Sequence, residues 1–177
     1  MISVALAAGI IQDLRVVHRR DDGYEIDTAP ERIDLPRVQH WLTTDAYWAQ
    51  GRAPEAIERS IAGSVCFGVY APGGAQVGFA RAVTDGATFA WIADVYVARD
   101  HRGLGIGTWL AHAVRDHLFD LGVPRIVLAT MDAHGVYAKV GFAPLVNPDR
   151  YMEIDRRPPF VGPARRSGAA HTTNGEI

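Results

Sequence analysis

The pattern that most constrains the fold of this chain is a succession of a predicted strand, a glycine-rich loop, an amphipathic helix and a second strand. Residues 88–97 are predicted as a strand, and Arg102-Gly103-Leu104-Gly105-Ile106-Gly107 follows as the loop. Apolar residues then recur with a period of 3.6 up to Leu121, which indicates a helix with one buried face. Residues 125–130 form an apolar run typical of a buried strand. Such a strand–helix–strand unit predicts two neighbouring parallel strands.

An antiparallel meander is predicted before this unit. Apolar strands at 65–70 and 76–83 lead into 88–97 through short turns that contain glycine. The other predicted elements are a short strand at 24–27, helices that begin at 35 and 54, a short helix at 133–140 and a last strand at 151–154. The sequence therefore predicts an α+β fold with a mixed sheet, in which an antiparallel meander meets one parallel pair, and about four helices.

The length of 177 residues, 48% of them apolar, fits one domain with additional residues at both ends. We expect an N-terminal extension over 1–21, a domain over 22–155, and a flexible tail rich in Pro, Gly and Arg over 156–177. The apolar stretch 2–11 is shorter than the roughly 20 residues that span a bilayer, and no positive charge precedes it. These features predict a soluble, cytoplasmic protein that does not bind membranes.

Composition also argues against several classes of function. The net charge of −2 argues against a nucleic-acid-binding protein, whose surface is usually strongly basic. The single cysteine, Cys66, excludes an internal disulfide and a zinc site of the CxxC type. His112 and Asp116 share one face of the predicted helix but lack a third ligand, so no metal site is expected.

The glycine loop has the features of a phosphate-binding turn. Glycines allow the backbone to approach a ligand closely, and the following helix presents unpaired N–H groups with a partial positive charge. Arg102 adds a planar cation suited to phosphate. A nucleotide P-loop would need a Lys, and a dinucleotide fingerprint would need a third Gly where Thr108 or Leu110 stands. A flexible surface turn remains the alternative for the glycines alone.

The surroundings of the loop resemble the GNAT acyltransferase superfamily. Asp94-Val95-Tyr96-Val97, followed by the loop and helix, is similar to the acyl-CoA-binding motif R/Q-x-x-G-x-G/A of that superfamily. Val136-Tyr137-Ala138-Lys139-Val140-Gly141-Phe142 is similar to its Y-x-K-x-G-F segment. The resemblance covers residues 24–155 and implies a GNAT-like fold in which the two parallel strands splay apart.

The resemblance also implies residues that bind acetyl-CoA. Backbone groups of Val95, Tyr96 and Val97 would pair with the pantetheine arm, and an N–H among them would polarise the thioester carbonyl. The pyrophosphate would be held by Arg102 and by the amides of Gly103, Leu104, Gly105, Ile106, Gly107 and Thr108.

Two residues are predicted to act in catalysis. The resemblance assigns Tyr137 as the acid that protonates the departing thiolate, and a core aromatic is the alternative reading. An amine acceptor is protonated at neutral pH and must lose a proton before it attacks. Asp94, a carboxylate within an apolar strand, is the candidate base or anchor for the substrate ammonium, with a structural hydrogen-bonding role as its alternative.

The acceptor is expected to bind to the first half of the chain. Trp41, Asp45, Tyr47 and Trp48 cluster there, and aromatic rings with one carboxylate suit an organic cation. Packing of these aromatics in the core is the alternative. Asp132 and His134 follow the strand at 126–130, where the splay would open the site. For Asp132 a helix N-cap and for His134 a polar helix-start residue are the alternatives.

These observations predict a bacterial-type N-acetyltransferase. It would move the acetyl group of acetyl-CoA to a small-molecule or peptide amine by direct attack in a ternary complex, and homodimerisation through edge strands fits such a fold. The rival hypotheses are an acyl-CoA-binding regulatory module without turnover and a nucleotide-binding oxidoreductase. Amino acids, polyamines, antibiotics and protein N-termini all stay open as acceptors.

Overall fold

The structure is a computed structural model, and it describes residues 15–156. Its centre is a six-stranded sheet in which the strands follow one another in chain order. The strands are β1 (Val17–Arg19), β2 (Glu25–Asp27), β3 (Val65–Tyr70), β4 (Gln76–Thr84), β5 (Ala90–Val97) and β6 (Ile126–Val127). Neighbouring strands are antiparallel except β5 and β6, which are parallel. The predicted meander with one parallel pair is therefore confirmed.

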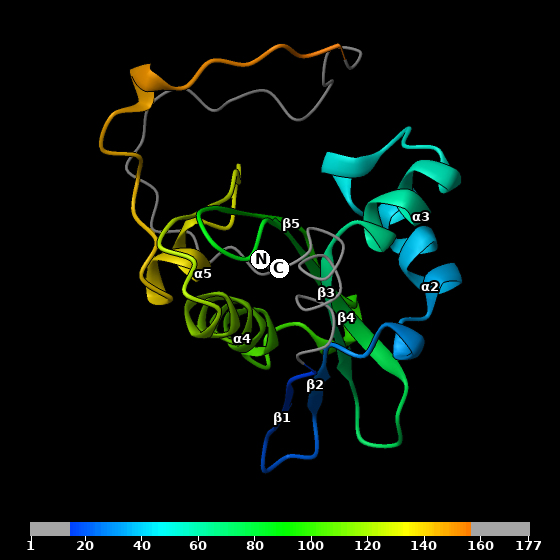
Figure 1. Cartoon of the computed structure of the whole chain (residues 1–177). Coiled ribbons are helices and arrows are strands. Elements are labelled where there is room, and N and C mark those ends of the chain that lie inside the picture. The colour runs from blue at the N-terminus through cyan, green and yellow to red at the C-terminus, as the bar shows by residue number, and fades with distance from the viewer. Residues whose placement is uncertain (1–14, 157–177) are drawn as a thin grey trace, which may run out of the picture.

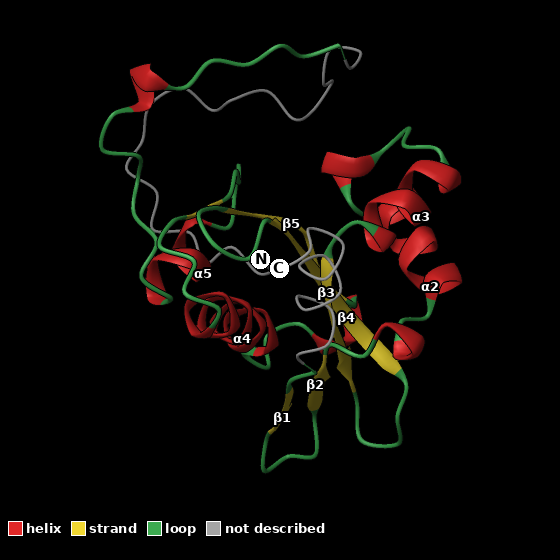
Figure 2. Ribbon diagram, in the orientation of Figure 1, coloured by secondary structure: helices red, strands yellow, loops and turns green. Residues whose placement is uncertain are grey.

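Helices cover both faces of the sheet (Figures 1 and 2). Within residues 15–156 there are four α-helices, as the sequence predicts: α2 (Leu35–His40), α3 (Pro54–Ala62), α4 (Ile106–Asp120) and α5 (His134–Lys139). Helices α2 and α3 lie on one side of the sheet, and α4 and α5 on the other. Short helical turns lie between or beside these elements: η1 (Pro30–Arg32), η2 (Trp41–Asp45), η3 (Tyr47–Ala49), η4 (Arg99–His101) and η5 (Pro148–Arg150).

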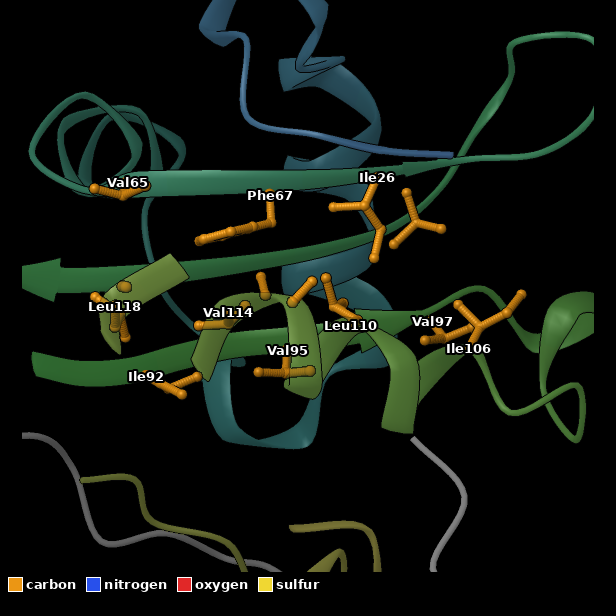
Figure 3. Close-up of a cluster of buried hydrophobic side chains, with 14 of the residues drawn as sticks. Ile26, Val65, Phe67, Ile92, Val95, Val97, Ile106, Leu110, Val114 and Leu118 are labelled. Carbon is orange, nitrogen blue, oxygen red and sulfur yellow. The ribbon is translucent and has the colours of Figure 1, made fainter. Parts of the chain in front are cut away.

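Alternation along the strands builds a separate core on each face. Val95 and Val97 point toward α4, where they meet Ile106 and Leu110 (Figure 3). The residue between the two valines, Tyr96, belongs to the other core, with residues of α2, η2 and α3. This period of two is what a sheet covered on both faces requires. The strand β5 therefore takes part in both cores.

Strands β5 and β6 diverge soon after they meet. Their pairing is limited to Ala90 with Ile126 and Trp91 with Val127. Strand β5 continues to Val97, so its edge on the β6 side carries no strand partner from residue 92 onward within residues 15–156. The predicted strand at 125–130 is thus shorter than expected, because residues 128–130 leave the sheet where the two strands splay.

The ends of the described chain depart from the predicted strands. Val17–Arg19 forms β1 against β2, although it precedes the predicted domain boundary at residue 22. The predicted strand at 151–154 is wrong: the segment pairs with no strand within residues 15–156, and Met152 and Ile154 are 97% and 92% exposed. In Figure 1 it runs clear of the sheet, in orange, so its alternating apolar residues find no edge to join.

The predictions for residues 1–14 and 157–177 lie outside the described residues. Among residues 15–156, no helix combines the length and the apolar character that a membrane crossing needs.

Candidate active site

The glycine loop between η4 and α4 is built from two left-handed glycines. Gly103 has φ of 74° and Gly105 has φ of 72°, a region that favours glycine over other residues. A Cβ added at Gly105 would have no heavy atom within 4 Å, so the space beside the loop is open. The amide N–H groups of residues 103–108 have no hydrogen-bond partner among residues 15–156. The loop and the first turn of α4 thus offer six successive backbone donors to a ligand.

Arg102 stands at the entrance to this loop. Its Nε donates to the carbonyl oxygen of Val97 at 2.9 Å, and its guanidinium lies 5.4 Å from the ring centre of Tyr96. Its two terminal nitrogens have no hydrogen-bond partner within residues 15–156. The fork of Arg102 is therefore held at the end of β5 with its outer donors available for an anion.

The donor set fits the pyrophosphate of CoA. A doubly charged pyrophosphate needs several N–H donors and a cation, and both stand together here. The unpaired edge of β5, where the pantetheine arm is expected at Val95, Tyr96 and Val97, ends close to the same loop. The residues predicted to bind the cofactor are thus contiguous in space.

A β-bulge interrupts β5 just before this edge. Ala93 pairs with Arg81 and Tyr96 with Phe79, so Asp94 and Val95 together oppose a single residue of β4. Asp94 is the one non-glycine residue with positive φ in the described chain, at 53°. The bulge changes the direction of the peptide groups that follow it.

Asp94 is engaged by two arginines. Its Oδ2 accepts from Arg52 Nη1 at 2.7 Å and from Arg81 Nε at 2.6 Å, and its side chain is only 2% exposed. Arg52 precedes α3 and Arg81 lies on β4, so the carboxylate ties both to the bulge. This geometry favours the structural alternative for Asp94, although the sequence offered no signal for which arginines would pair with it.

Tyr137 is buried on α5 and packs against Ala111 and Val140, with the Phe142 ring edge-on at 5.9 Å. Its hydroxyl has no hydrogen-bond partner among residues 15–156. Burial, reinforced by Asp132 and Tyr47, raises the pKa of Tyr137 well above its usual 10. The hydroxyl therefore keeps its proton at neutral pH and is free to donate it.

A second pair lies next to Tyr137. Tyr47 Oη donates to Asp132 Oδ1 at 3.0 Å, across 85 residues of sequence. Burial and then Asp132 raise the pKa of Tyr47 to about 12. Asp132 is not the helix cap: Ala133 holds that position, and its N–H donates to Thr130 Oγ1. His134 is the exposed first residue of α5. We refer to Tyr47, Asp132 and Tyr137 as the tyrosine cluster.

The other predicted acceptor residues mostly support packing. Trp41 is buried and stacks on Tyr96, with ring centres 5.1 Å apart. Asp45 accepts from Tyr96 Oη at 2.7 Å and from Arg99 Nη2 at 2.9 Å. Trp48, half-buried, lies edge-on to Tyr47 at 4.9 Å. Trp48 is therefore the member of this group that lies against the tyrosine cluster.

Potential metal ligands do not gather in the part of the chain that the structure describes. No three side chains of His, Cys, Asp or Glu there stand close enough together to hold an ion. Cys66 is buried, and burial raises the pKa of its thiol to about 12.

Comparison with known proteins gives one consistent result. The model of the acetyltransferase (GNAT) family matches residues 35–142. A crystal structure of a putative GNAT-family acetyltransferase from Xanthomonas campestris pv. campestris is 39% identical, with a TM-score of 0.70 over 75% of this chain and 92% of that one. A curated protein of Gibberella zeae, named a putative acetyltransferase, is 28% identical over 66% of this chain and 76% of its own length.

A more distant structure shares the fold. It is a predicted acetyltransferase with acetyl-CoA from Clostridium acetobutylicum, 16% identical, with a TM-score of 0.57 over 75% of this chain and 95% of that one. The family model spans well over half of the chain and includes the glycine loop, α4 and Tyr137. The chain therefore belongs to the GNAT acetyltransferase family.

Proposed function

We propose that this protein transfers an acetyl group from acetyl-CoA to an amine by direct attack in a ternary complex. The observation that carries the proposal is the run of unpartnered amides at residues 103–108 beside the free fork of Arg102. Acetyl-CoA, when bound, supplies a thioester as the acetyl donor. The amides and Arg102 would hold its pyrophosphate, and the open edge of β5 its pantetheine arm.

Tyr137 is suited to act as the general acid. Transfer forms a C–N bond and breaks a C–S bond, and the departing sulfur then needs a proton. Tyr137 carries a proton at Oη at neutral pH, as any phenol with a pKa of about 10 or above does, and no hydrogen bond within residues 15–156 competes for it. The hydroxyl is thus available to hydrogen-bond to the developing sulfur anion and to transfer its proton to it.

The acceptor amine is proposed to bind at the tyrosine cluster. The carboxylate of Asp132 is exposed and accepts from Tyr47, so it can also pair with an ammonium group. The Trp48 ring beside Tyr47 adds an aromatic surface for a cation. The sequence-based hypothesis that Asp94 is the base is less favoured, because two ion pairs already occupy its carboxylate. A prediction below tests this hypothesis.

Direct transfer is favoured over a covalent acetyl-enzyme. Cys66 is the single cysteine of the chain, and burial raises the pKa of its thiol to about 12. A thiol that stays protonated is a poor nucleophile. Cys66→Ala should therefore leave turnover unchanged if the protein stays folded.

The test is titration of the full chain with acetyl-CoA, followed by measurement of CoA release across a panel of amines. We expect saturable binding and release that depends on the amine. Binding without release on any amine would favour the regulatory module instead. Absence of acetyl-CoA binding would overturn the proposal, and binding of NADH would support the oxidoreductase.

A further inference from the structure

The turn between β1 and β2 reaches the glycine loop. Arg20, in this turn, donates from Nη1 to the carbonyl oxygen of Leu104 at 3.1 Å. Its guanidinium also lies 5.4 Å from the ring centre of Trp109, in the first turns of α4. One side chain thus contacts both the loop and the helix that we assign to the pyrophosphate.

The structure holds Arg20 in a fixed position. Asp22 accepts from Arg20 Nε at 3.1 Å and from Nη2 at 2.6 Å, and the ring centre of Tyr24 lies 5.6 Å from the guanidinium. The Arg20 side chain is 26% exposed, whereas that of its neighbour Arg19 is 75% exposed. Arg20 is therefore a built part of the structure rather than a solvated surface cation.

A second contact joins the same turn to the loop. Tyr24 Oη and His101 Nδ1 are 2.7 Å apart and share a hydrogen bond. His101 ends η4, directly before Arg102. The hairpin of β1 and β2 thus contacts the chain on both sides of Gly103, at His101 and at Leu104. These two hydrogen bonds together restrict the motion of the loop.

The bond to Leu104 has a consequence for the next amide. In a trans peptide the C=O and the N–H point in opposite directions. When Arg20 holds the Leu104 carbonyl, the N–H of Gly105 points away from Arg20, and it has no partner within residues 15–156. Gly105 has little intrinsic preference between positive and negative φ, so without Arg20 this peptide could rotate.

We propose that Arg20 is a positioning residue for cofactor binding: it orients the Leu104–Gly105 peptide so that its N–H faces the pyrophosphate. This inference rests on the proposed function, because it presumes that acetyl-CoA binds at the loop. It also gives the residues before the predicted domain boundary a part in the cofactor site.

The decisive variant is Arg20→Met, which keeps an unbranched aliphatic side chain, shorter than that of Arg, and removes the donors and the charge. Two acetyl donors are compared: acetyl-CoA, and S-acetylpantetheine, which lacks the pyrophosphate. We expect the Kd for acetyl-CoA to rise about tenfold and the KM for S-acetylpantetheine to stay unchanged. Arg19→Met, a change at an exposed neighbour, is the matched control and should affect neither.

A second variant separates positioning from simple charge attraction and does not depend on Arg20→Met folding. Asp22→Asn leaves Arg20 in place but removes the carboxylate that fixes it. Loss of positioning weakens acetyl-CoA binding, by about threefold, whereas an unmasked Arg20 charge would strengthen it. Melting temperatures of both variants report their folding.

Each outcome of these titrations bears either on Arg20 or on the proposed function. Weaker acetyl-CoA binding with unchanged use of S-acetylpantetheine supports the inference. Wild-type affinity in Arg20→Met, an equal loss for both donors, or tighter binding in Asp22→Asn would overturn it. Failure of the wild-type protein to bind acetyl-CoA would instead overturn the proposed function.

Discussion

The cofactor side and the acceptor side of this protein are prepared for their ligands in different ways. At the glycine loop the binding groups are backbone amides, which have no partner among the described residues. On the acceptor side several polar side chains are already paired: Asp45 and Asp94 each bind two partners, and Tyr47 binds Asp132. The cofactor side therefore exposes backbone N–H donors without a partner, whereas these side chains of the acceptor side are already hydrogen-bonded.

The difference indicates how each region can change. Backbone donors depend on the φ angles of two glycines, so a cofactor site of this kind tolerates few substitutions at those positions. Side-chain pairs can be exchanged one at a time, so the acceptor side can be altered without loss of the cofactor. Substitutions in the loop should therefore strongly reduce acetyl-CoA binding. Substitutions in the side-chain pairs should have smaller effects, and these can be measured separately from cofactor binding.

The largest effect is expected from Gly105→Glu. The substitution places a non-glycine residue at φ of 72° and a negative charge beside the pyrophosphate site. Because strain and repulsion act together, affinity for acetyl-CoA should fall by about a thousandfold, below detection in a calorimetric titration.

Gly122→Glu is the matched control for this variant. Gly122 follows the other end of α4, has φ of 83°, and likewise has open space where a Cβ would lie. It carries the same strain and the same charge away from the loop. Equal loss of acetyl-CoA affinity in the two variants would contradict the assignment of the loop.

The second-largest effect is expected from Tyr137→Phe, which removes the hydroxyl and keeps the ring against Phe142. Loss of a general acid typically costs about a hundredfold or more in rate, so kcat should fall by that order while acetyl-CoA affinity stays the same. Since burial raises the pKa of Tyr137, the wild-type kcat should show no loss from ionisation of this group up to about pH 10.

Tyr151→Phe serves as its control, because Tyr151 is exposed and contacts Arg125 away from the tyrosine cluster. An unchanged kcat in Tyr137→Phe would remove Tyr137 as the acid. A fall in both variants would point to loss of folding instead.

The cofactor side could be predicted from the sequence because its determinants are local. The positions of the glycines and the 3.6-residue period of α4 are both visible within a few residues. The start of α2, on the other side of the sheet, is equally local, because Asp34 directly before it accepts from the N–H of Arg37. The role of Tyr137 came from a family resemblance rather than from any such local pattern.

The rest could not be predicted because it depends on distant partners. Strand β1 contains His18 and Arg19 and lacks an apolar alternation, and it forms because β2 offers an edge. Residues 151–154 have the alternation but no edge. The sequence marked Asp94 as a carboxylate within an apolar strand, but it did not indicate its partners, because Arg52 lies 42 residues away in sequence and Arg81 lies 13 away. A sequence pattern can indicate that a residue requires a partner, but the tertiary fold determines which distant residue that partner is.

Asp94→Asn tests whether this carboxylate is a catalytic base or a structural tie, that is, a group that holds Arg52 and Arg81 in place. Asn tolerates positive φ, so the variant removes the charge and leaves the bulge conformation accessible. A structural tie predicts a loss of about 2 kcal/mol in unfolding free energy, since two arginines lose their partner and one of them, Arg52, is partly exposed. A chemical denaturation curve measures the loss.

A base predicts a different result: unchanged stability, and a kcat that recovers as pH rises and the amine loses its proton unaided. A second variant, Asp94→Gly, removes every side-chain contact at a φ that glycine accepts. Stability equal to wild type in both variants would contradict the structural role.

The smallest effect is expected at the acceptor side, from Asp132→Asn. Asp132 contributes to the raised pKa of Tyr47, about 12, and with burial unchanged the variant should lower that pKa toward its usual value. A Tyr whose folded pKa lies above its unfolded value adds stability that is lost as pH rises from about 10 to about 12, and this loss should be smaller in the variant. Absorbance of the phenolate during an alkaline titration measures the shift directly, with Tyr47→Phe to identify the signal.

The same variant also tests the division between the two regions. Because Asp132 is exposed, we expect only about a threefold rise in the KM for the amine and no change in acetyl-CoA affinity. The carboxylate would pair with the ammonium group in contact with water, where a single ion pair contributes little. A change in acetyl-CoA affinity without a change in the amine KM would place Asp132 on the cofactor side and reverse that division.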